Sequence, residues 1–259
     1  MHSLALRARM SSFPAGVIRD CLPWRGKIPE LGTKTMGDEP NAAGDLCQDL
    51  RQELLRRRDV DQAARSACQG QHWEQLARLI PIDDDNTAWL EKVVETVGWP
   101  GRSLVGEEGA HAAWLLAQHA DRYPALQQRW LTLLEQAVAD GEAAPADLAS
   151  LTDRVLLARG ESQVYGTQVN GRDGRFVASR LRELETVDLR RASVGLGTLE
   201  AQLQHMLSLY GPPRPALVAC PTCSAEIEAW LPEIGGRSTI ECPSCRSTAT
   251  IKARIRGSS

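Results

Sequence analysis

Two cysteine pairs near the C-terminus constrain this chain more than any other feature. The pairs are Cys220-Pro-Thr-Cys223 and Cys242-Pro-Ser-Cys245, and eighteen residues separate them. Four thiolates on two short turns complete the tetrahedral coordination of Zn²⁺ and leave no position open, which is typical of a structural site. We therefore predict a structural zinc ion that is bound by all four cysteines.

The residues around the cysteine pairs predict a small β unit. Polar and apolar residues alternate over 225–230 and 248–255, and a third extended segment spans 238–240. The segment 217–259 resembles a zinc ribbon. About forty residues bury too little surface to fold alone, so metal binding would supply folding free energy on the order of 10 kcal/mol.

Disulfides or a redox dithiol are the alternatives for these cysteines. A redox Cys-x-x-Cys motif normally opens a helix beside a βαβ unit, and no helical pattern follows either pair. The other cysteines, Cys21, Cys47 and Cys68, are scattered, and the total of seven is odd. Both facts argue against a disulfide framework and favour a reducing cytoplasm.

Charge and hydropathy exclude several kinds of partner. The net charge of −3 gives no field that would draw the chain to nucleic acid or to an anionic membrane. No apolar run approaches the roughly 18 residues that a membrane span needs. Lys252, Arg254 and Arg256 share one strand face, but only Trp230 offers a base-stacking surface nearby. We expect at most weak nucleic-acid binding and no membrane association.

Composition divides the chain into four segments. Residues 1–35 are basic and contain three prolines, which predicts a disordered N-terminal extension. A helical domain follows over 36–210. The run Gly211-Pro-Pro-Arg-Pro215 cannot continue a helix, so residues 211–216 are predicted to be a stiff linker that separates the helical domain from the ribbon at 217–259.

The central domain is predicted to be an antiparallel helical bundle. Apolar residues recur at helical spacing over 46–55, 87–97, 103–119, 180–189 and 199–209, and again after residues 121 and 145. Asp85 or Asn86, Ser103 and Asp121 are the predicted N-caps of three of these helices. Short connections between successive helices imply antiparallel neighbours.

A small β-hairpin interrupts the helices. Tyr165, Thr167 and Val169 favour a strand, and two Gly-containing turns at 170–171 and 173–174 precede a second short strand at 175–177. The predicted fold class is therefore mainly α, with an inserted hairpin and a small C-terminal β zinc ribbon.

Several separated motifs of the central domain resemble one known family. In chain order they are Asp84–Leu90, Gly98–Pro100, Ser103–Gly106, Gln118–Asp121, Asp153-Arg154 and Gln163–Gln168. Over roughly residues 45–210 this order resembles the uncharacterised bacterial family called domain of unknown function 6624. The resemblance implies no established reaction, substrate or cofactor.

His119 and Asp121 are the candidate catalytic residues. A histidine at the end of an apolar helix can act as a general acid or base when a carboxylate orients its ring. The alternative is structural, because a histidine at a helix C-terminus also interacts favourably with the helix dipole, while Asp121 caps the next helix.

Six polar residues are candidates for ligand binding: Asn86, Arg154, Gln163, Tyr165, Thr167 and Gln168. Strand periodicity places Gln163, Tyr165 and Thr167 on one face, and Gly166 would let a ligand approach the backbone. Alternatively, these side chains satisfy buried backbone groups, and Arg154 pairs with Asp84 or Asp85 or binds an anion. The Arg190-Arg191 pair is predicted to be solvated surface.

Two functions remain open. The first is a binding protein whose helical domain recognises a small polar ligand or a protein partner, with the ribbon as a second recognition surface. The second is a small hydrolase that uses His119 and Asp121. No phosphate-binding loop, dinucleotide fingerprint or nucleophile elbow occurs in the sequence. The test that separates the two is whether the candidate polar residues converge in space.

Overall fold

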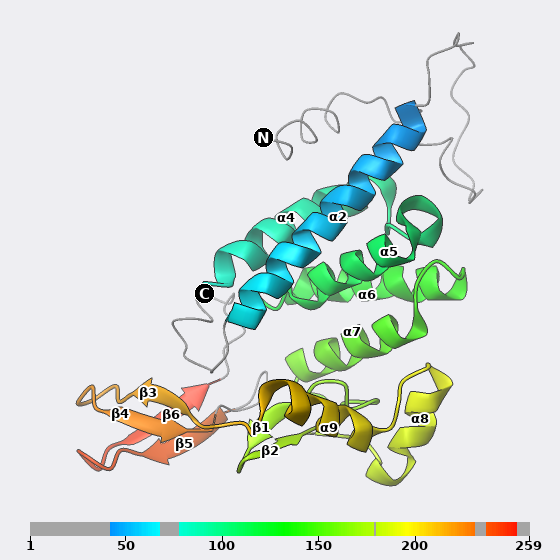
Figure 1. The fold of residues 1–259 in the computed structure, drawn as a ribbon. Helices are drawn as coiled ribbons and strands as arrows, with labels where there is room; N and C mark the ends of the chain where they lie inside the picture. Colours follow the sequence, from blue (N-terminus) through cyan, green and yellow to red (C-terminus); the bar gives the residue numbers. More distant parts are fainter. Residues whose placement is uncertain (1–41, 68–77, 179, 231–236, 253–259) are drawn as a thin grey trace.

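Long helices build the central domain, as predicted. The structure is a computed structural model that describes residues 42–67, 78–178, 180–230 and 237–252. Its long helices are α2 (Ala42–Ala67), α4 (Ile80–Val97), α5 (Arg102–Gln118), α6 (Pro124–Ala139) and α7 (Pro145–Ala158). Helix α2 packs mainly on α5, and α7 packs on both α5 and α6 (Figure 1). The predicted N-terminal extension lies outside the described residues.

The helices bury two adjoining apolar clusters. Leu54, Leu90 and Trp130 are fully buried in the first cluster, and Leu134 and Leu151 are fully buried in the second. These residues belong to the helical apolar stripes of the sequence, so the 3.6-residue period determines which faces meet. Within the described ranges, none of the helices combines the length and the apolar character that crossing a bilayer requires.

Helix α4 begins earlier than predicted. Pro81 lies in its first turn, where the fixed φ of proline favours helix and its missing N–H costs nothing. Asp85 and Asn86 therefore lie inside the helix, and the prediction that one of them caps it is wrong.

The other two predicted caps are also wrong. Helix α5 follows Gly101, and the Ser103 N–H donates to the side chain of Glu142 over 2.7 Å. Helix α6 begins at Pro124, three residues after Asp121. The Asp121 carboxylate instead accepts hydrogen bonds from the Arg154 side chain.

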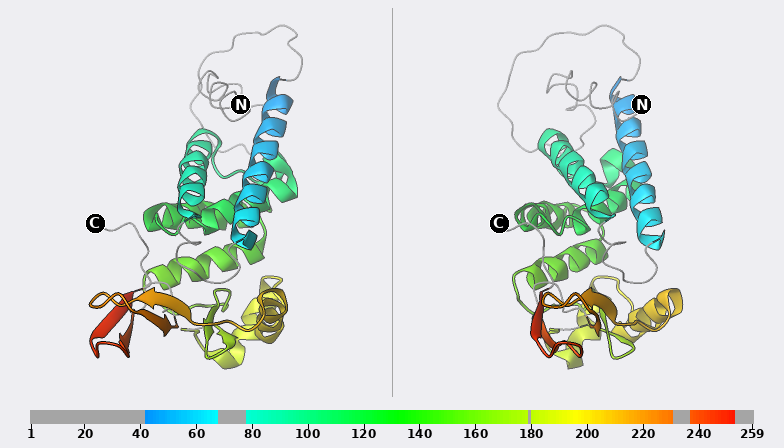
Figure 2. Two further views of the ribbon diagram at one scale, coloured as in Figure 1. Left: turned by 60° about the vertical axis from the view of Figure 1, so that its left-hand side comes forward. Right: turned by 90° about the vertical axis from the view of Figure 1, so that its left-hand side faces the viewer.

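The predicted hairpin is present, but its first strand begins later than predicted, at Asn170 where a turn was expected, and residues 165–169 are not a strand. Strands β1 (Asn170–Arg172) and β2 (Arg175–Val177) are antiparallel, and Gly171 lies opposite Phe176. The helix predicted over 180–189 is replaced by a short 3₁₀ helix, η2 (Leu184–Thr186), and by α8 (Val187–Ser193). Helix α9 (Leu199–Tyr210) follows. In both views of Figure 2 the strands, α8 and α9 gather on the α7 side of the bundle, away from α4.

Two short antiparallel ladders form the C-terminal unit. Strand β3 (Ala216–Ala219) pairs with β4 (Glu226–Ala229), and β5 (Arg237–Glu241) pairs with β6 (Thr248–Lys252). Strand β3 was not among the three strands expected from the sequence. Each cysteine pair lies in the turn that joins the two strands of one ladder.

The linker and the ribbon touch the inserted hairpin. A Cβ atom built on Gly171 would lie 2.4 Å from Cβ of Pro213 and 3.4 Å from the Trp230 ring. Pro213 is buried and Trp230 is half-buried. The linker, which the sequence predicts to be a spacer, therefore packs on β1, and only glycine leaves room for this contact.

Candidate functional site

The four cysteines of the ribbon converge on one point. Their Sγ atoms all lie within 4.8 Å of one another. The Sγ atoms of Cys220 and Cys245 are 3.7 Å apart, and those of Cys223 and Cys242 are also 3.7 Å apart. Four sulfurs at about 2.3 Å from a tetrahedral ion are about 3.8 Å apart, whereas a disulfide needs about 2.05 Å. The cluster can therefore hold a metal ion.

Local hydrogen bonds prepare Cys220 for a metal, whereas the neighbouring cysteines raise the pKa of Cys223 to about 12. Backbone N–H groups of Cys223 and Thr222, together with the Ser247 hydroxyl, lower the pKa of Cys220 to about 5. The Thr222 N–H lies 3.4 Å from this sulfur. Because the thiolate is the form that binds metal, these donors favour the ligand state of Cys220.

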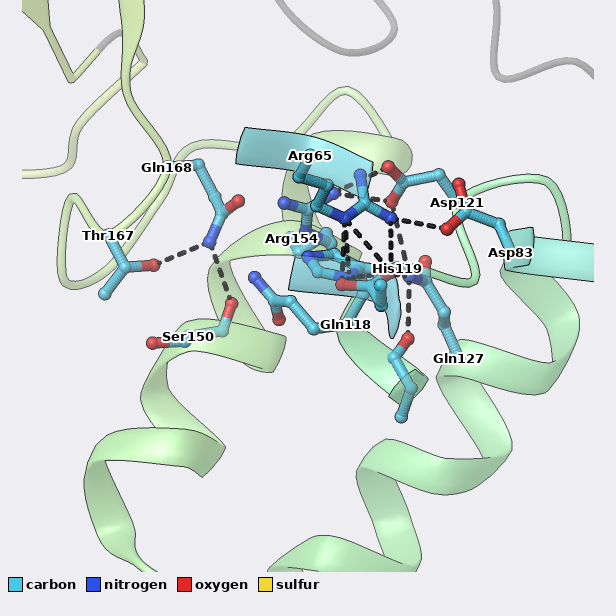
Figure 3. Close-up of polar contacts among 12 residues, drawn as sticks. Arg65, Asp83, Gln118, His119, Asp121, Gln127, Ser150, Arg154, Thr167 and Gln168 are labelled. Atoms are coloured by element: carbon cyan, nitrogen blue, oxygen red, sulfur yellow. Dashed lines mark hydrogen bonds and ion pairs between the residues drawn. The ribbon is translucent and has the colours of Figure 1, made fainter. Parts of the chain in front are cut away.

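A second polar site lies where α2, α4, α5 and α7 approach one another (Figure 3). At the end of α5, Nδ1 of His119 lies 3.0 Å from Oδ2 of Asp61 on α2. The Asp61 side chain is 0 % exposed. Nδ1 also accepts from Nε of Arg65 over 3.0 Å, so both Asp61 and Arg65 hold the ring through this nitrogen. Within the described part of the chain, the other ring nitrogen, Nε2, has no hydrogen-bond partner.

Arg65 lies in the centre of this site. Its Nε donates to both Asp61 oxygens over 3.1 Å and lies 3.0 Å from Nδ1 of His119. Its Nη2 pairs with the Asp83 carboxylate of α4. The ligand atoms of Asp61, Asp83 and His119 lie within 4.8 Å of one another, which suits a cation. The Arg65 guanidinium already supplies a positive charge there.

Burial and neighbouring charges separate the acidities of the two carboxyl groups. Burial alone would raise the pKa of Asp61, but hydrogen bonds from His119 and Arg65 outweigh it and lower the pKa to about 2. Burial raises the pKa of Asp83 to about 7, against the attraction of Arg65. Burial also lowers the pKa of His119, so the imidazole is neutral near pH 7.

Arg154 and Asp121 form the other half of the site. Nη1 of Arg154 donates to both oxygens of Asp121, over 2.7 and 2.6 Å. Arg154 is thus paired with neither Asp84 nor Asp85, which bind Arg122 and Arg57 respectively. Below, the "His119 cluster" denotes the six residues Asp61, Arg65, Asp83, His119, Asp121 and Arg154.

The segment 163–168 wraps around Asp153 and is not a strand. The backbone N–H groups of Val164, Tyr165 and Thr167 all donate to the fully buried Asp153 carboxylate, over 2.7 to 3.2 Å. Gly166 has a φ of +67°, and this left-handed turn directs the flanking amides inward. The predicted alternation of side chains between two faces is therefore wrong.

Other side chains satisfy the carbonyls of the same segment. Arg190 donates to the Val164 carbonyl and Arg191 to the Tyr165 carbonyl, over 2.7 and 2.9 Å. Arg191 is only 2 % exposed, so the prediction of a solvated arginine pair is wrong. Gln202 donates to the Thr167 carbonyl over 3.0 Å. The segment is thus fixed on both its N–H and its C=O sides.

Comparison with known proteins gives one match. Residues 48–212 match a family of unknown function, DUF6624. The chain belongs to the DUF6624 family. The match covers the helices, the hairpin and α9 and ends before the ribbon. No curated protein and no solved structure matches this chain.

The DUF6624 domain brings together some of the predicted residues. His119, Asp121 and Arg154 share the His119 cluster, and Thr167 and Gln168 lie next to it (Figure 3). Nε2 of Gln168 donates to the Ser150 carbonyl over 3.2 Å.

Three predicted residues have other contacts. Gln163 is fully buried and exchanges two hydrogen bonds of 2.9 Å with the backbone of Gln168. The backbone of Tyr165 is bound by Asp153 and Arg191. Oδ1 of Asn86 accepts from Arg57 over 2.9 Å, in a separate network.

Sequence reasoning missed Asp61, Arg65 and Asp83. One signal for Asp61 was available, because Leu50, Leu54 and Asp61 lie at helical spacing on one face of α2. A carboxylate in phase with two core leucines must be buried and therefore needs a cationic or hydrogen-bonding partner. No comparable local pattern marks Arg65 or Asp83.

Proposed function

We propose that the DUF6624 domain binds a small polar ligand at the His119 cluster. The observation that carries the proposal is the state of His119. Asp61 holds the ring through Nδ1, and Nε2 has no hydrogen-bond partner among the described residues. The His119 side chain is 14 % exposed, so Nε2 is open to water or to a ligand, and this availability supports the proposal.

The charges of the cluster support the same proposal. Three carboxylates, two guanidinium groups and one neutral imidazole meet where several helices end. The pKa of Asp83 is raised and that of Asp61 is lowered within one site. Groups with opposite shifts at one place are more typical of functional sites than of packing.

Acid–base catalysis, as in a hydrolase, is the second candidate. Asp61 rather than Asp121 is the carboxylate that orients His119. In the tautomer that donates from Nδ1 to Asp61, the neutral imidazole presents a basic Nε2, which can accept a proton from water or from a substrate hydroxyl. Asp83, with a pKa of about 7, can serve as the complementary acid.

For the ribbon we propose a structural Zn²⁺ ion bound by Cys220, Cys223, Cys242 and Cys245. Four thiolates in a closed tetrahedron favour zinc over the hard cations Mg²⁺ and Ca²⁺. Free thiols and a bound zinc ion both fit the reducing cytoplasm. A protein partner for the ribbon remains compatible with this role.

A thermal-shift screen of polar metabolites tests the ligand-binding proposal. We expect a compound that raises the melting temperature of the wild type and of His111→Ala but not that of His119→Ala. His111 is the matched control, because it lies on the same helix and pairs with Asp147 away from the cluster. Hits that stabilise His119→Ala as much as the wild type would contradict the proposal.

Turnover separates the two candidate functions. If the domain is an enzyme, the hit is consumed, and the rate falls as pH decreases through the lowered pKa of His119. A hit that binds without turnover at any pH between 5 and 9 supports a binding domain.

A further inference from the structure

Two sulfur–sulfur contacts cross between the ladders of the ribbon, which lie beside each other in Figure 1. Sγ of Cys220 lies 3.7 Å from Sγ of Cys245, and Sγ of Cys223 lies 3.7 Å from Sγ of Cys242. Cys220 and Cys242 are buried, whereas Cys223 and Cys245 are exposed. Each contact therefore joins a cysteine at the surface to a buried cysteine of the other ladder.

The two contacts differ in one neighbouring group. The Ser247 hydroxyl lies 3.0 Å from Sγ of Cys245 and 3.6 Å from Sγ of Cys220. Among the residues that the structure describes, no hydroxyl group is hydrogen-bonded to Cys223 or to Cys242. Ser247 thus distinguishes the first contact from a second contact that matches it in distance and in burial.

The contact between Cys220 and Cys245 has the features of an oxidation site. Oxidant-sensitive cysteines are accessible to solvent and have a second cysteine nearby that resolves the first oxidation product. Cys245 is the accessible residue, and Cys220 is its partner. A disulfide shortens the sulfur–sulfur distance from 3.7 Å to about 2.05 Å, so a metal ion held between the sulfurs must leave.

From the exposed cysteine, its buried partner and the hydroxyl group beside both, we propose that Cys220 and Cys245 form a peroxide-sensitive pair. A peroxide converts the pair into a disulfide, and the metal ion is released. A cellular thiol reverses the change by thiol–disulfide exchange. The inference goes beyond the structural role proposed for zinc, and it rests on that role only for the release of metal.

The reaction consumes one peroxide molecule for one disulfide. Sγ of Cys245 attacks a peroxide oxygen, the O–O bond breaks, and a sulfenic acid and water form. Sγ of Cys220 then attacks the sulfenic sulfur, the S–S bond forms, and the hydroxyl group leaves as water. The two sulfurs lose two electrons, which the peroxide accepts. The two protons that complete the water molecules come from the thiols, or from solvent when the sulfurs are metal-bound thiolates.

Ser247 assists the second step. Hydroxide is a poor leaving group, so a proton donor beside the sulfenic oxygen accelerates its departure. The Ser247 hydroxyl lies 3.0 Å from Sγ of Cys245, within reach of an oxygen that is bonded to this sulfur. Because Cys223 and Cys242 have no such donor, the disulfide between Cys220 and Cys245 forms first.

Stoichiometric oxidation of the full chain tests the inference. We expect one equivalent of hydrogen peroxide to release the metal ion, which a chromogenic chelator measures, and dithiothreitol with added Zn²⁺ to restore binding. Trypsin cuts after Arg237, so Cys220 and Cys245 lie on different peptides. The disulfide keeps these peptides joined in non-reducing mass spectrometry, while Cys223 and Cys242 remain free for alkylation.

Two serine variants test the role of the hydroxyl group. Ser247→Ala should form the disulfide about tenfold more slowly, which is the effect of one lost hydrogen bond. Ser244→Ala is the matched control, because Ser244 lies in the same connection between β5 and β6, is exposed and forms no side-chain hydrogen bond with the described residues. The metal content of both variants should equal that of the wild type, which shows that the site itself is intact.

Several outcomes overturn the inference. They are metal that is retained at a peroxide dose that fully oxidises glutathione, sulfinic acids without a disulfide, and a first disulfide between any other pair of cysteines. An unchanged rate in Ser247→Ala would refute the role of Ser247. If the starting protein contains no metal, the zinc ion proposed above is wrong, but joined peptides would still establish the oxidation site.

Discussion

The ribbon and the His119 cluster both concentrate ionisable groups, but they compensate the charge in opposite ways. The cysteine cluster consists of four potential thiolates within 4.8 Å of one another, with no positive side chain among them. The His119 cluster has acidic groups at comparable separations, but it contains Arg65 and Arg154. The first site can therefore hold an external cation, whereas the second has its own positive charges.

This difference predicts different responses to the loss of one component. Removing the metal should unfold the ribbon, because its two ladders share few other contacts around a small core of Cys220, Ile227 and Cys242. Removing one charge from the His119 cluster should leave the fold intact but change its free energy of unfolding, because the remaining charges are no longer compensated.

Metal removal should produce the largest effect. In Cys223→Ser, or with a strong chelator, we expect the ribbon to unfold, since metal binding contributes on the order of 10 kcal/mol to such units. Metal analysis and hydrogen exchange over β4 and β6 measure this loss. Cys47→Ser is the control, because Cys47 lies in α2.

The helical far-UV signal of Cys223→Ser should remain close to that of the wild type. A simultaneous loss of helix and ribbon would show that the two regions fold as one unit, and the comparison would fail. Retention of a full metal equivalent in Cys223→Ser would contradict the four-cysteine site.

Loss of the Asp61 charge should have the next largest effect. Asp61→Asn leaves Arg65 and His119 without their buried carboxylate, so we expect the free energy of unfolding to fall by about 3–5 kcal/mol at pH 7. Urea denaturation measures the change. Asp59→Asn should change stability by less than about 0.5 kcal/mol, because the Asp59 side chain is 66 % exposed. Similar values for both variants would mean that Asp61 does not hold the cluster together.

Removing the charge of Asp83 should have the opposite effect on the free energy of unfolding, and this effect should depend on pH. Its pKa of about 7 in the folded state exceeds the value of about 4 in the unfolded chain, so the folded state binds the proton more tightly. Stability from this group is complete below pH 4 and is lost as pH rises through 7. Asp83→Asn mimics the protonated form.

We therefore expect Asp83→Asn to be nearly neutral at pH 4 and to stabilise the domain at pH 8. The gain should be on the order of 2–4 kcal/mol, because each tenfold change in proton affinity corresponds to about 1.4 kcal/mol. Urea denaturation at both pH values measures it. Destabilisation at pH 8 would show that the Arg65–Asp83 attraction outweighs burial.

Disturbing the contact of the linker and ribbon with the hairpin should give the smallest effect on stability. Gly171→Ala places a methyl group against Pro213, so we expect a loss of about 1–3 kcal/mol from overpacking. Gly197→Ala is the control, because a Cβ there would meet nothing within 4 Å. Thermal denaturation of both variants measures the difference. Equal melting temperatures would mean that the ribbon and linker do not rest on the hairpin.

The sequence predicted the features that depend on local spacing. The cysteine pairs, the hairpin and the helical stripes each follow from residues that are close along the chain. The His119 cluster does not, because Arg65 and Asp61 reach His119 across 54 and 58 positions. Such pairings follow from how α2 and α5 pack, which a single sequence does not specify.

The wrong predictions also have local physical causes. Proline in the first turn moved the starts of α4 and α6 away from the expected caps. The positive φ of Gly166 turned an apparently alternating segment into a loop around Asp153. In both cases backbone restrictions of single residues outweighed the side-chain pattern.

The position of Pro213 has a practical consequence for anyone who shortens the protein. The family match ends at residue 212, and a cut at that point would remove Pro213 and Trp230 together. Strand β1 would then present the bare backbone of Gly171 to solvent, in a hairpin of only two strands. An isolated two-stranded hairpin is only marginally stable, so a shortened protein should have a less stable hairpin than the full chain. The limit of sequence similarity is therefore a poor place to cut.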